Sequence, residues 1–341
     1  MKILIDGRSM TSQISGIGRY TLELTKAYVA KFGENNVTVI VNYPPTYLPY
    51  KWIKCPYDRH SFIDNLKFSA FLAKQDYDIY HSGDLIGPFW HKSGKQHIIT
   101  VHDLMFFIVP DFFSMGSIRA YLRKCRIKPF FKYMLHDADL IVSVSQATHE
   151  DLKRIYGYNS IVVREGINQI AYGEDPEPYD GLKPNSYFLY VGLGAPHKNI
   201  QFMIDAFLKA KTDRKLVICG KGHTPVDSQR IIYLGFVSDR QLSYLYQNCA
   251  AFIFPSKYEG FGLPILEALS HHCKVFSSNA GSLGEFSKGI IYFFNPYKEE
   301  ELLTLIENCD SIHIDEKKID NYLQHFEWKN IWNEFFSEYI K

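Results

Sequence analysis

The sequence contains few cysteines, and their spacing excludes the common cysteine-based sites. Six cysteines are scattered over 341 residues, and no Cys-x-x-Cys pair occurs among them. Scattered thiols of this kind are typical of a reducing compartment, and they indicate neither a disulfide framework nor a zinc site. No cluster of histidine and cysteine along the sequence suggests zinc either. We therefore expect free thiols and no bound metal.

A long apolar run and a dominant charge are also missing. No apolar segment approaches the roughly 18 residues that a membrane span needs. Residues 1–5 lead directly into Asp6 without a signal-peptide cleavage region. The net charge is +1, so no overall field attracts nucleic acid. We expect a cytoplasmic protein without a nucleic-acid partner, which at most lies on the inner face of a membrane.

The chain does contain enough apolar material for two ordinary domains. Hydrophobic residues make up 46% and charged residues 22% of the sequence, as in soluble globular proteins. Aromatic residues reach 16%, with 24 Tyr and 25 Phe. This excess fits either aromatic-rich cores or an aromatic cleft for an acceptor, and composition does not separate the two.

Short apolar runs and helix-like segments alternate in two series. Such alternation predicts parallel sheets, because a strand, a crossover helix and a second strand form a parallel βαβ unit. Residues 169–185 are rich in Pro, Gly and acids without periodicity, so they read as a linker. The fold class is therefore α/β, with two Rossmann-like parallel-sheet domains facing a cleft. The expected strands are 2–5, 37–41, 78–81, 97–102, 139–145 and 161–166, then 187–191, 215–219, 231–235, 250–254 and 274–278.

Two glycines mark the loop after the first strand. Gly16 and Gly18 lie in a polar loop that precedes a helix-like segment, residues 21–30. A nicotinamide-binding loop would need a third glycine where Thr21 stands, and an acid where Asn42 stands. The glycines still allow the backbone to approach a phosphate.

The most informative stretch is 254–270, which joins a buried strand to a helix that begins near Pro264. A glycine turn between a strand and a helix N-terminus directs free N–H groups and the positive end of the helix dipole at one point. Glu259 and Glu267 bracket this turn. Because carboxylates repel an anion, we expect them to bind hydroxyl groups beside a phosphate, and a sugar nucleotide offers both.

Glu259 and Glu267, with seven residues between them, resemble the E-x7-E motif of GT-B fold, retaining, family 4-type glycosyltransferases. The surrounding Pro-Ser-x-x-Glu-Gly-Phe-Gly-Leu-Pro is similar to that family nearly letter for letter. The resemblance implies a GT-B fold with an N-terminal acceptor domain and a C-terminal nucleotide-sugar domain. We place these domains at 1–170 and 185–324, with a C-terminal helix, 325–341, that packs back on the first domain.

The resemblance also implies roles for single residues. Glu267 would hold the ribose hydroxyls of the donor, and Glu259 would approach the hydroxyls of the donor sugar. His102 matches the active-site histidine that faces the donor sugar. Independently of the resemblance, the neighbouring Asp103 is a candidate to orient its imidazole. The other expected donor-binding groups are Gly16, Gly18 and the backbone N–H groups of Phe261, Gly262 and Leu263.

The segment from Gly192 to Lys198 resembles the phosphate-clamping loop of the same family. Lys198 matches the family lysine, whereas His197 stands where the family has an arginine. A planar, permanently charged fork is thereby replaced by a group that can be neutral at pH 7. Lys198 is expected to bind the diphosphate, and the role of His197 stays open.

Two Asp-x-Asp pairs could hold a divalent ion, Asp76 with Asp78 and Asp137 with Asp139. Both pairs directly precede expected strands, at the end of the sheet opposite the ligand crevice. We interpret them as surface acids and expect a metal-independent enzyme. Charge on the leaving diphosphate then falls to Lys198 and to backbone N–H groups.

The resemblance favours a hexosyltransferase that retains the anomeric configuration and needs no cofactor. The absence of an obvious nucleophile fits a front-face reaction. The opening residues 5–8 and 16–20 are most similar to bacterial mannosyltransferases of lipopolysaccharide O-chain assembly, so GDP-mannose is the first candidate donor and a UDP-hexose the second. A glycan or lipid-linked molecule is the expected acceptor. The alternatives are a GT-B phosphorylase or epimerase, and a non-catalytic sugar-nucleotide binding module.

Residues 118–135 interleave basic and aromatic side chains, with a proline at 129. The simpler interpretation is a solvated helix face. The other is a surface that meets anionic lipid head groups or a pyrophosphate-linked lipid acceptor, which would make the protein peripheral to the membrane. The sequence supports both equally.

Overall fold

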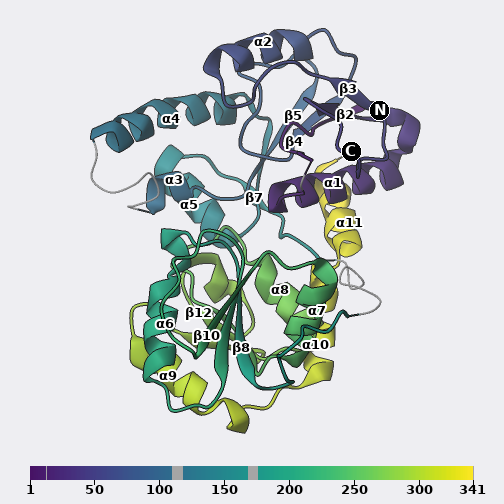
Figure 1. The fold of residues 1–341 in the computed structure, drawn as a ribbon. Coiled ribbons are helices and arrows are strands. Elements are labelled where there is room, and N and C mark those ends of the chain that lie inside the picture. The colour runs from purple at the N-terminus through teal and green to yellow at the C-terminus, as the bar shows by residue number, and fades with distance from the viewer. Residues whose placement is uncertain (13, 110–117, 168–175, 341) are drawn as a thin grey trace. The chain divides into compact units, whose positions relative to one another are not determined.

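A computed structural model describes residues 1–12, 14–109, 118–167 and 176–340, with the backbone alone at 118–126 (Figure 1). The chain forms two compact units, Met1–Glu165 together with Ile331–Lys341, and Gly166–Asn330. Each unit is built on one parallel sheet, so the predicted pair of Rossmann-like domains is confirmed. The units divide after residues 165 and 330. Linker composition and the family resemblance instead place the linker at 170–185 and the end of the second domain at 324.

The first unit contains a seven-stranded sheet in which every neighbouring pair is parallel. The central strands are apolar because both faces of a parallel sheet are covered, and Ile3, Leu4 and Ile5 are almost fully buried. In sheet order the strands are β3 (Trp52–Lys54), β2 (Val37–Val41), β1 (Ile3–Asp6), β4 (Ile79–Ser82), β5 (Gln96–Val101), β6 (Leu140–Ser143) and β7 (Ile161–Val162).

Helices of the first unit begin at serine caps. Ser15, Ser61 and Ser145 each accept a hydrogen bond from a backbone N–H of the following turn, which satisfies a donor that the helix itself leaves unpaired. The first helix begins at Gly16, so the predicted loop through residue 19 is wrong. The helices are α1 (Gly16–Phe32), α2 (Phe62–Leu72), α3 (Met105–Ile108), α4 (Ile118–Asp137) and α5 (Gln146–Tyr156), with a 3₁₀ turn η1 (Glu34–Asn36).

The second unit contains a six-stranded parallel sheet. Figure 1 shows α6 and α9 along one face of this sheet, and α7, α8 and α10 along the other. In sheet order its strands are β10 (Ile231–Gly235), β9 (Lys215–Cys219), β8 (Tyr187–Val191), β11 (Ala251–Phe254), β12 (Val275–Ser278) and β13 (Ile291–Phe294). Its helices are α6 (Ile200–Lys209), α7 (Asp239–Asn248), α8 (Leu263–Ser270), α9 (Glu299–Glu307) and α10 (Glu316–Leu323), with 3₁₀ turns η2 (Pro196–Lys198), η3 (Gly281–Glu285), η4 (Cys309–Ser311) and η5 (Gln324–Phe326).

Aromatic side chains fill the interiors of both units. The largest fully buried side chains are all tyrosine or phenylalanine, which accounts for part of the aromatic excess in the composition. They are Tyr20, Tyr28, Tyr77, Tyr80, Tyr187, Tyr190, Tyr246, Phe68, Phe188, Phe207, Phe252 and Phe254.

The last helix, α11 (Trp328–Tyr339), completes the core of the first unit from residue 331 onward. The Trp332 ring lies 5.7 Å from Tyr20, and the Phe336 ring lies 4.9 Å from Tyr28. Both partners are on α1, so the two ends of the chain share one core.

Two further findings bear on the expectations from composition. The side chain of Cys125 is not among those described. The other five cysteines are free thiols, as expected. Among the described helices, none combines the length and apolar character that a membrane crossing requires.

Candidate active site

His102 directly follows β5, at the carboxyl edge of the first sheet. Its ring nitrogens both have partners: Nδ1 donates to Glu165 Oε1 at 2.7 Å, and Nε2 donates to the Gly83 carbonyl at 2.9 Å. Burial alone would lower the pKa of His102, but the hydrogen bond and charge of Glu165, helped by Asp84, raise it to about 9. The imidazole is therefore protonated at neutral pH, because only the imidazolium can donate from both nitrogens.

Glu165 orients His102, which corrects the role expected of Asp103. The carboxylate of Asp103 accepts the backbone N–H of Met105 at the start of α3. Glu165 is 7% exposed and lies just after β7, 63 residues from its partner. Sequence reasoning missed it. The available signal was an acid at the exit of a predicted strand, where ligand-facing side chains gather in open α/β sheets.

Gly16 and Gly18 occupy the first turn of α1, beside the same sheet edge. A Cβ on Gly16 would meet open space, whereas Gly18 is buried and donates its N–H to the Ser15 cap at 3.1 Å. The N-terminus of a 17-residue helix favours an anion. On the next turn, Tyr20 meets His102 edge to face at 4.6 Å. The structure thus joins the glycine turn and the histidine through one tyrosine.

In the second unit the structure brings Lys198 and Glu259 together. Lys198 Nζ lies 2.7 Å from Glu259 Oε1, and the two side chains are 16% and 12% exposed. Lys198 follows β8 and Glu259 follows β11, and these strands are neighbours in the sheet. The carboxyl ends of adjacent parallel strands therefore hold a cation and a carboxylate side by side. The ammonium also lies 5.4 Å from the centre of the Phe254 ring.

Glycines let two loops touch backbone to backbone beside this pair. A Cβ on Gly194 would lie 2.0 Å from the Gly222 carbonyl oxygen, and one on Gly220 would lie 1.9 Å from that of Gly192. Gly220 also has a φ of +119°, which other residues rarely adopt. A hydrogen bond from Gly194 N–H to the Lys221 carbonyl, at 2.8 Å, fixes the contact. The predicted clamping loop therefore depends on the neighbouring 220–222 loop, to which the sequence assigned no function.

Ser282 contacts the backbone of the turn between Glu259 and α8. The Ser282 hydroxyl lies 2.8 Å from the Glu259 carbonyl and 2.9 Å from that of Phe261. Gly262 is the N-cap of α8 and has a φ of +128°, so the N-cap position offers no side chain to the first turn of this helix. Leu263 begins the helix, so the N–H groups predicted to bind an anion lie at its N-terminus. Ser282 was another residue that the sequence did not reveal.

His197 and Glu267 complete the predicted set. His197 is 7% exposed, burial lowers its pKa, and its Nδ1 has no hydrogen-bond partner among the described residues. A neutral imidazole therefore stands where the family has an arginine. Glu267 lies four residues after the start of α8 and is half-buried. His102, Gly16 and Gly18 belong to the first unit and the other predicted site residues to the second.

The predicted basic and aromatic stretch 118–135 forms most of α4. Its side chains are described from residue 127 onward, so Arg119, Arg123, Lys124 and Arg126 lie outside the described side chains. Lys128, Lys132 and Tyr133 are exposed. Phe130 lies 6.1 Å from Phe62 on α2, and Phe62 is itself 55% exposed.

The Asp-x-Asp pairs lie just before β4 and β6, as expected. Asp76, Asp78 and Asp139 are exposed, and Asp76 and Asp78 pair with Lys2 and Lys95. Asp137 differs, because it is 15% exposed and contacts two histidines. Its interpretation as a surface acid is therefore wrong.

Comparison with protein families supports one assignment for both halves. Residues 178–322 match the model of glycosyl transferases group 1, and residues 14–169 match the model of glycosyltransferase family 4. An O-antigen chain mannosyltransferase B of Escherichia coli is 30% identical over 348 residues, covering 84% of each chain. The O-antigen chain mannosyltransferase RfbU of Salmonella typhimurium is 24% identical over 251 residues, covering 70% of this chain and 67% of the relative.

Solved structures support the same fold at lower identity. The lipopolysaccharide outer core galactosyltransferase WaaB superposes with a TM-score of 0.70 at 19% identity, covering 98% of each chain. HepE of Anabaena, solved with UDP-glucose, superposes with a TM-score of 0.69 at 16% identity, covering 99% of this chain and 98% of its own.

Proposed function

The chain belongs to the GT-B glycosyltransferases of the group 1, family 4 type, and from this premise we propose that it transfers a hexose, with retained anomeric configuration, from a nucleoside-diphosphate sugar. The acceptor is a glycan or lipid-linked molecule of bacterial polysaccharide or lipopolysaccharide assembly. The observation that carries the proposal is the Lys198–Glu259 pair beside the uncapped first turn of α8. It sets a cation for a diphosphate next to a carboxylate for sugar hydroxyls.

Each predicted residue has a defined task in this reaction. Lys198 and the N–H groups of residues 261–263 bind the diphosphate, whose charge grows as the sugar leaves. Glu267 binds the ribose, while Glu259 and His102 act on the transferred sugar. The leaving phosphate takes the proton of the acceptor on the same face, so the reaction needs no protein nucleophile and no divalent metal.

GDP-mannose is the first candidate donor. The support is the group of mannosyltransferases among the relatives. A UDP-hexose is the second candidate, because fold neighbours have been solved with UDP and UDP-glucose. The test is a thermal-shift panel of GDP, UDP, ADP and their sugars, since a bound ligand raises apparent stability by mass action. The preferred diphosphate should stabilise the wild type and lose most of that effect on Lys198→Ala.

Two other classes of function could use the same residues. A non-catalytic sugar-nucleotide binding module would show the thermal shift but release no nucleoside diphosphate with acceptor extracts. A phosphorylase would exchange a glycosyl group with inorganic phosphate and release no nucleoside diphosphate, and an epimerase would act on the donor without an acceptor. Acceptor-dependent release of the diphosphate separates transfer from both alternatives.

The lipid-linked acceptor gives α4 a function at the inner face of the membrane. The exposed Lys128, Lys132 and Tyr133 are the described part of a basic and aromatic surface, and each such cation near an anionic leaflet contributes about 1 kcal/mol. Changing Arg123, Lys124 and Lys128 to Glu should reduce flotation with anionic vesicles, and high salt should do the same. Unchanged flotation would leave the stretch as a solvated helix face.

A further inference from the structure

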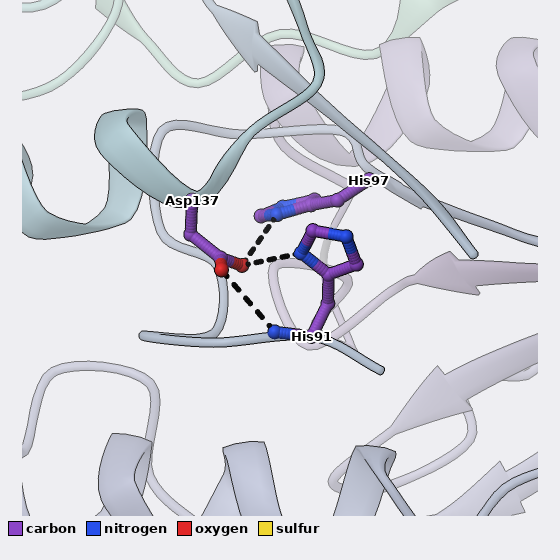
Figure 2. A group of neighbouring side chains, drawn as sticks. All are labelled: His91, His97 and Asp137. Carbon is purple, nitrogen blue, oxygen red and sulfur yellow. Dashed lines mark hydrogen bonds and ion pairs between the residues drawn. The ribbon is translucent and has the colours of Figure 1, made fainter. Parts of the chain in front are cut away.

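His91, His97 and Asp137 form a compact cluster at the amino ends of β5 and β6 (Figure 2). His91 lies in the loop before β5, His97 on β5, and Asp137 at the end of α4. Nδ1 of each histidine lies 3.0 Å from Asp137 Oδ2. One candidate ligand atom from each residue lies within 4.8 Å of the other two.

The His91 ring lies between two carboxylates. Its Nδ1 is hydrogen-bonded to Asp137 Oδ2 at 3.0 Å, and its Nε2 lies 3.3 Å from Asp139 Oδ2. A neutral imidazole can bind an ion through Nδ1 when its N–H is on Nε2, which is the nitrogen beside Asp139.

Neither carboxylate pairs with a lysine or an arginine among the described residues. The ion-pair partners of Asp137 there are the two histidines, and that of Asp139 is His91. No described lysine or arginine therefore stands where a metal ion would bind.

Backbone donors hold the carboxylates in place. Asp137 Oδ1 accepts the His91 N–H at 3.3 Å, which turns Oδ2 toward both rings, and Asp139 Oδ2 accepts the His97 N–H at 2.8 Å. The His97 side chain is fully buried, and its Nε2 has no hydrogen-bond partner among the described residues. Moving its proton from Nδ1 to Nε2 therefore breaks no existing contact on that side.

We propose that His91 Nδ1, His97 Nδ1 and Asp137 Oδ2 bind a divalent transition-metal ion of the Zn²⁺ class, with Asp139 orienting His91 from the second shell. Neighbouring donors around tetrahedral zinc lie about 3.3–3.5 Å apart, given bonds of about 2.0–2.2 Å, and the two 3.0 Å separations are close to this. A carboxylate that accepts the outer N–H of a ligating histidine is the usual support of such sites.

The ion has a structural role, because the cluster lies at the edge of the sheet opposite His102. His97 and His102 bound β5, and five residues of extended strand span about 17 Å. The ion ties the loop carrying His91 and the end of α4 to β5. The proposed metal site is therefore independent of the donor site. A negative result in the metal experiments would leave the proposed transfer reaction untouched.

The test is a titration of tag-free protein, freed of metal with EDTA and then of EDTA, with Zn²⁺ and with Co²⁺. His91→Asn removes a ligand at a half-buried position while an amide donor remains, and Asp137→Asn removes the charge. The matched control is His272→Asn, which breaks an exposed histidine–carboxylate pair with Asp320 in the second unit. His272 has a φ of +51°, which asparagine tolerates. Circular dichroism without metal checks that each variant is folded.

We expect one Zn²⁺ per wild-type chain, a visible Co²⁺ absorption band, and a Zn²⁺-dependent rise in unfolding temperature. The control should behave like the wild type, and His91→Asn should bind Zn²⁺ at least about tenfold more weakly and lose the band. If Asp137→Asn does not fold, His91→Asn decides. Equal affinity in wild type and His91→Asn would overturn the proposal. So would the absence of Zn²⁺ binding to the wild-type protein.

Discussion

The two units each place a cation against a carboxylate at the carboxyl edge of a parallel sheet, but the two pairs are built differently. His102 and Glu165 are 2.7 Å apart, as are Lys198 and Glu259, and all four side chains are 10–16% exposed. His102 has both nitrogens occupied, by Glu165 and the Gly83 carbonyl. Lys198 donates one of its three N–H groups to Glu259.

The two cations therefore differ in the donors that they can offer to a ligand. We call the charge of His102 fixed, because both ring nitrogens are occupied, and that of Lys198 available. His102 can offer a ligand the field of an imidazolium and the face of its ring, but a hydrogen bond from it would first require breaking an existing one. Lys198 can turn toward a diphosphate and keep Glu259 as a partner. Pairs with similar distances and burial thus differ in the hydrogen-bond donors that remain for a ligand, and the following experiments test whether this difference matters for function.

Removing the available charge should have the largest effect. Lys198→Ala should lower kcat by about 10²–10³, or about 3–4 kcal/mol of transition-state stabilisation, as deletion of an oxyanion-site donor does. The measurement is steady-state release of nucleoside diphosphate. Lys209→Ala, which breaks an exposed lysine–glutamate pair in the same unit, is the control and should retain activity. A Lys198 variant with normal kcat would remove this residue from the reaction.

Neutralising the partner of the fixed charge should mainly change stability. The pKa of His102 is raised from 6.5 to about 9, so its stabilising contribution is complete below about pH 6.5 and is lost as pH rises through 9. The shift corresponds to about 3 kcal/mol in the free energy of unfolding. Glu165→Gln should lower stability near pH 6 and flatten this fall, as measured by urea unfolding from pH 6 to 10.

A matched variant makes the pH experiment specific. Glu299→Gln neutralises the more exposed carboxylate of the Lys209 pair and should keep the wild-type pH profile. The difference between wild type and Glu165→Gln isolates His102 from the other groups that titrate in the alkaline range. Identical slopes in the wild type and in Glu165→Gln would mean that Glu165 does not raise the pKa of His102.

Variants of the residues assigned to different parts of the donor should separate binding of the nucleoside diphosphate from turnover. Glu267→Ala should weaken binding of the bare nucleoside diphosphate by about 10–100-fold, the cost of losing a charged hydrogen bond. Glu259→Ala and His102→Ala should bind it almost normally and turn over more slowly. Titration calorimetry together with kcat measures both quantities. A loss of diphosphate affinity in Glu259→Ala, with normal affinity in Glu267→Ala, would reverse the assignment.

Chelation should have the smallest effect on the reaction. EDTA should leave the rate of transfer unchanged, because Lys198 and backbone N–H groups carry the charge of the leaving diphosphate. The rate is measured with and without EDTA at a temperature well below unfolding, so that a stabilising ion at His91 does not enter. A collapse of turnover that Mg²⁺ or Mn²⁺ restores would contradict the expected chemistry.

The sequence predicted the central strands well because burial on both faces leaves a clear apolar signal. The inner strands 37–41, 187–191 and 215–219 have the predicted bounds, and so does the outermost strand 231–235 of the second sheet. The strand Trp52–Lys54 was missed because it is an edge strand of three residues with exposed ends. A strand of three residues is too short to show a period of two, so the sequence pattern does not identify it.

The residues proposed for the site are easiest to identify from the sequence where they lie close together along the chain. Residues 259–267 form a local motif, so their spacing along the chain is enough to predict how they lie relative to one another. Glu165 lies 63 residues from His102, and the contact of His97 with Asp137 spans 40 residues. Such contacts follow from the order of strands in the sheet, which a single sequence does not contain. The start of α1 was misplaced for another reason, since two glycines disfavour a helix while the Ser15 cap stabilises one.

The aromatic residues at the end of α11 also set the order in which the chain can fold during synthesis. A ribosome delivers the chain from its N-terminus, and domains generally fold as units as they emerge. Residues 166–330 are complete in the nascent chain before Trp332, Phe335 and Phe336 emerge to pack in the core of the first unit. The unit that is translated first is therefore the last to finish folding, and until then part of the aromatic surface of α1 lacks its final cover.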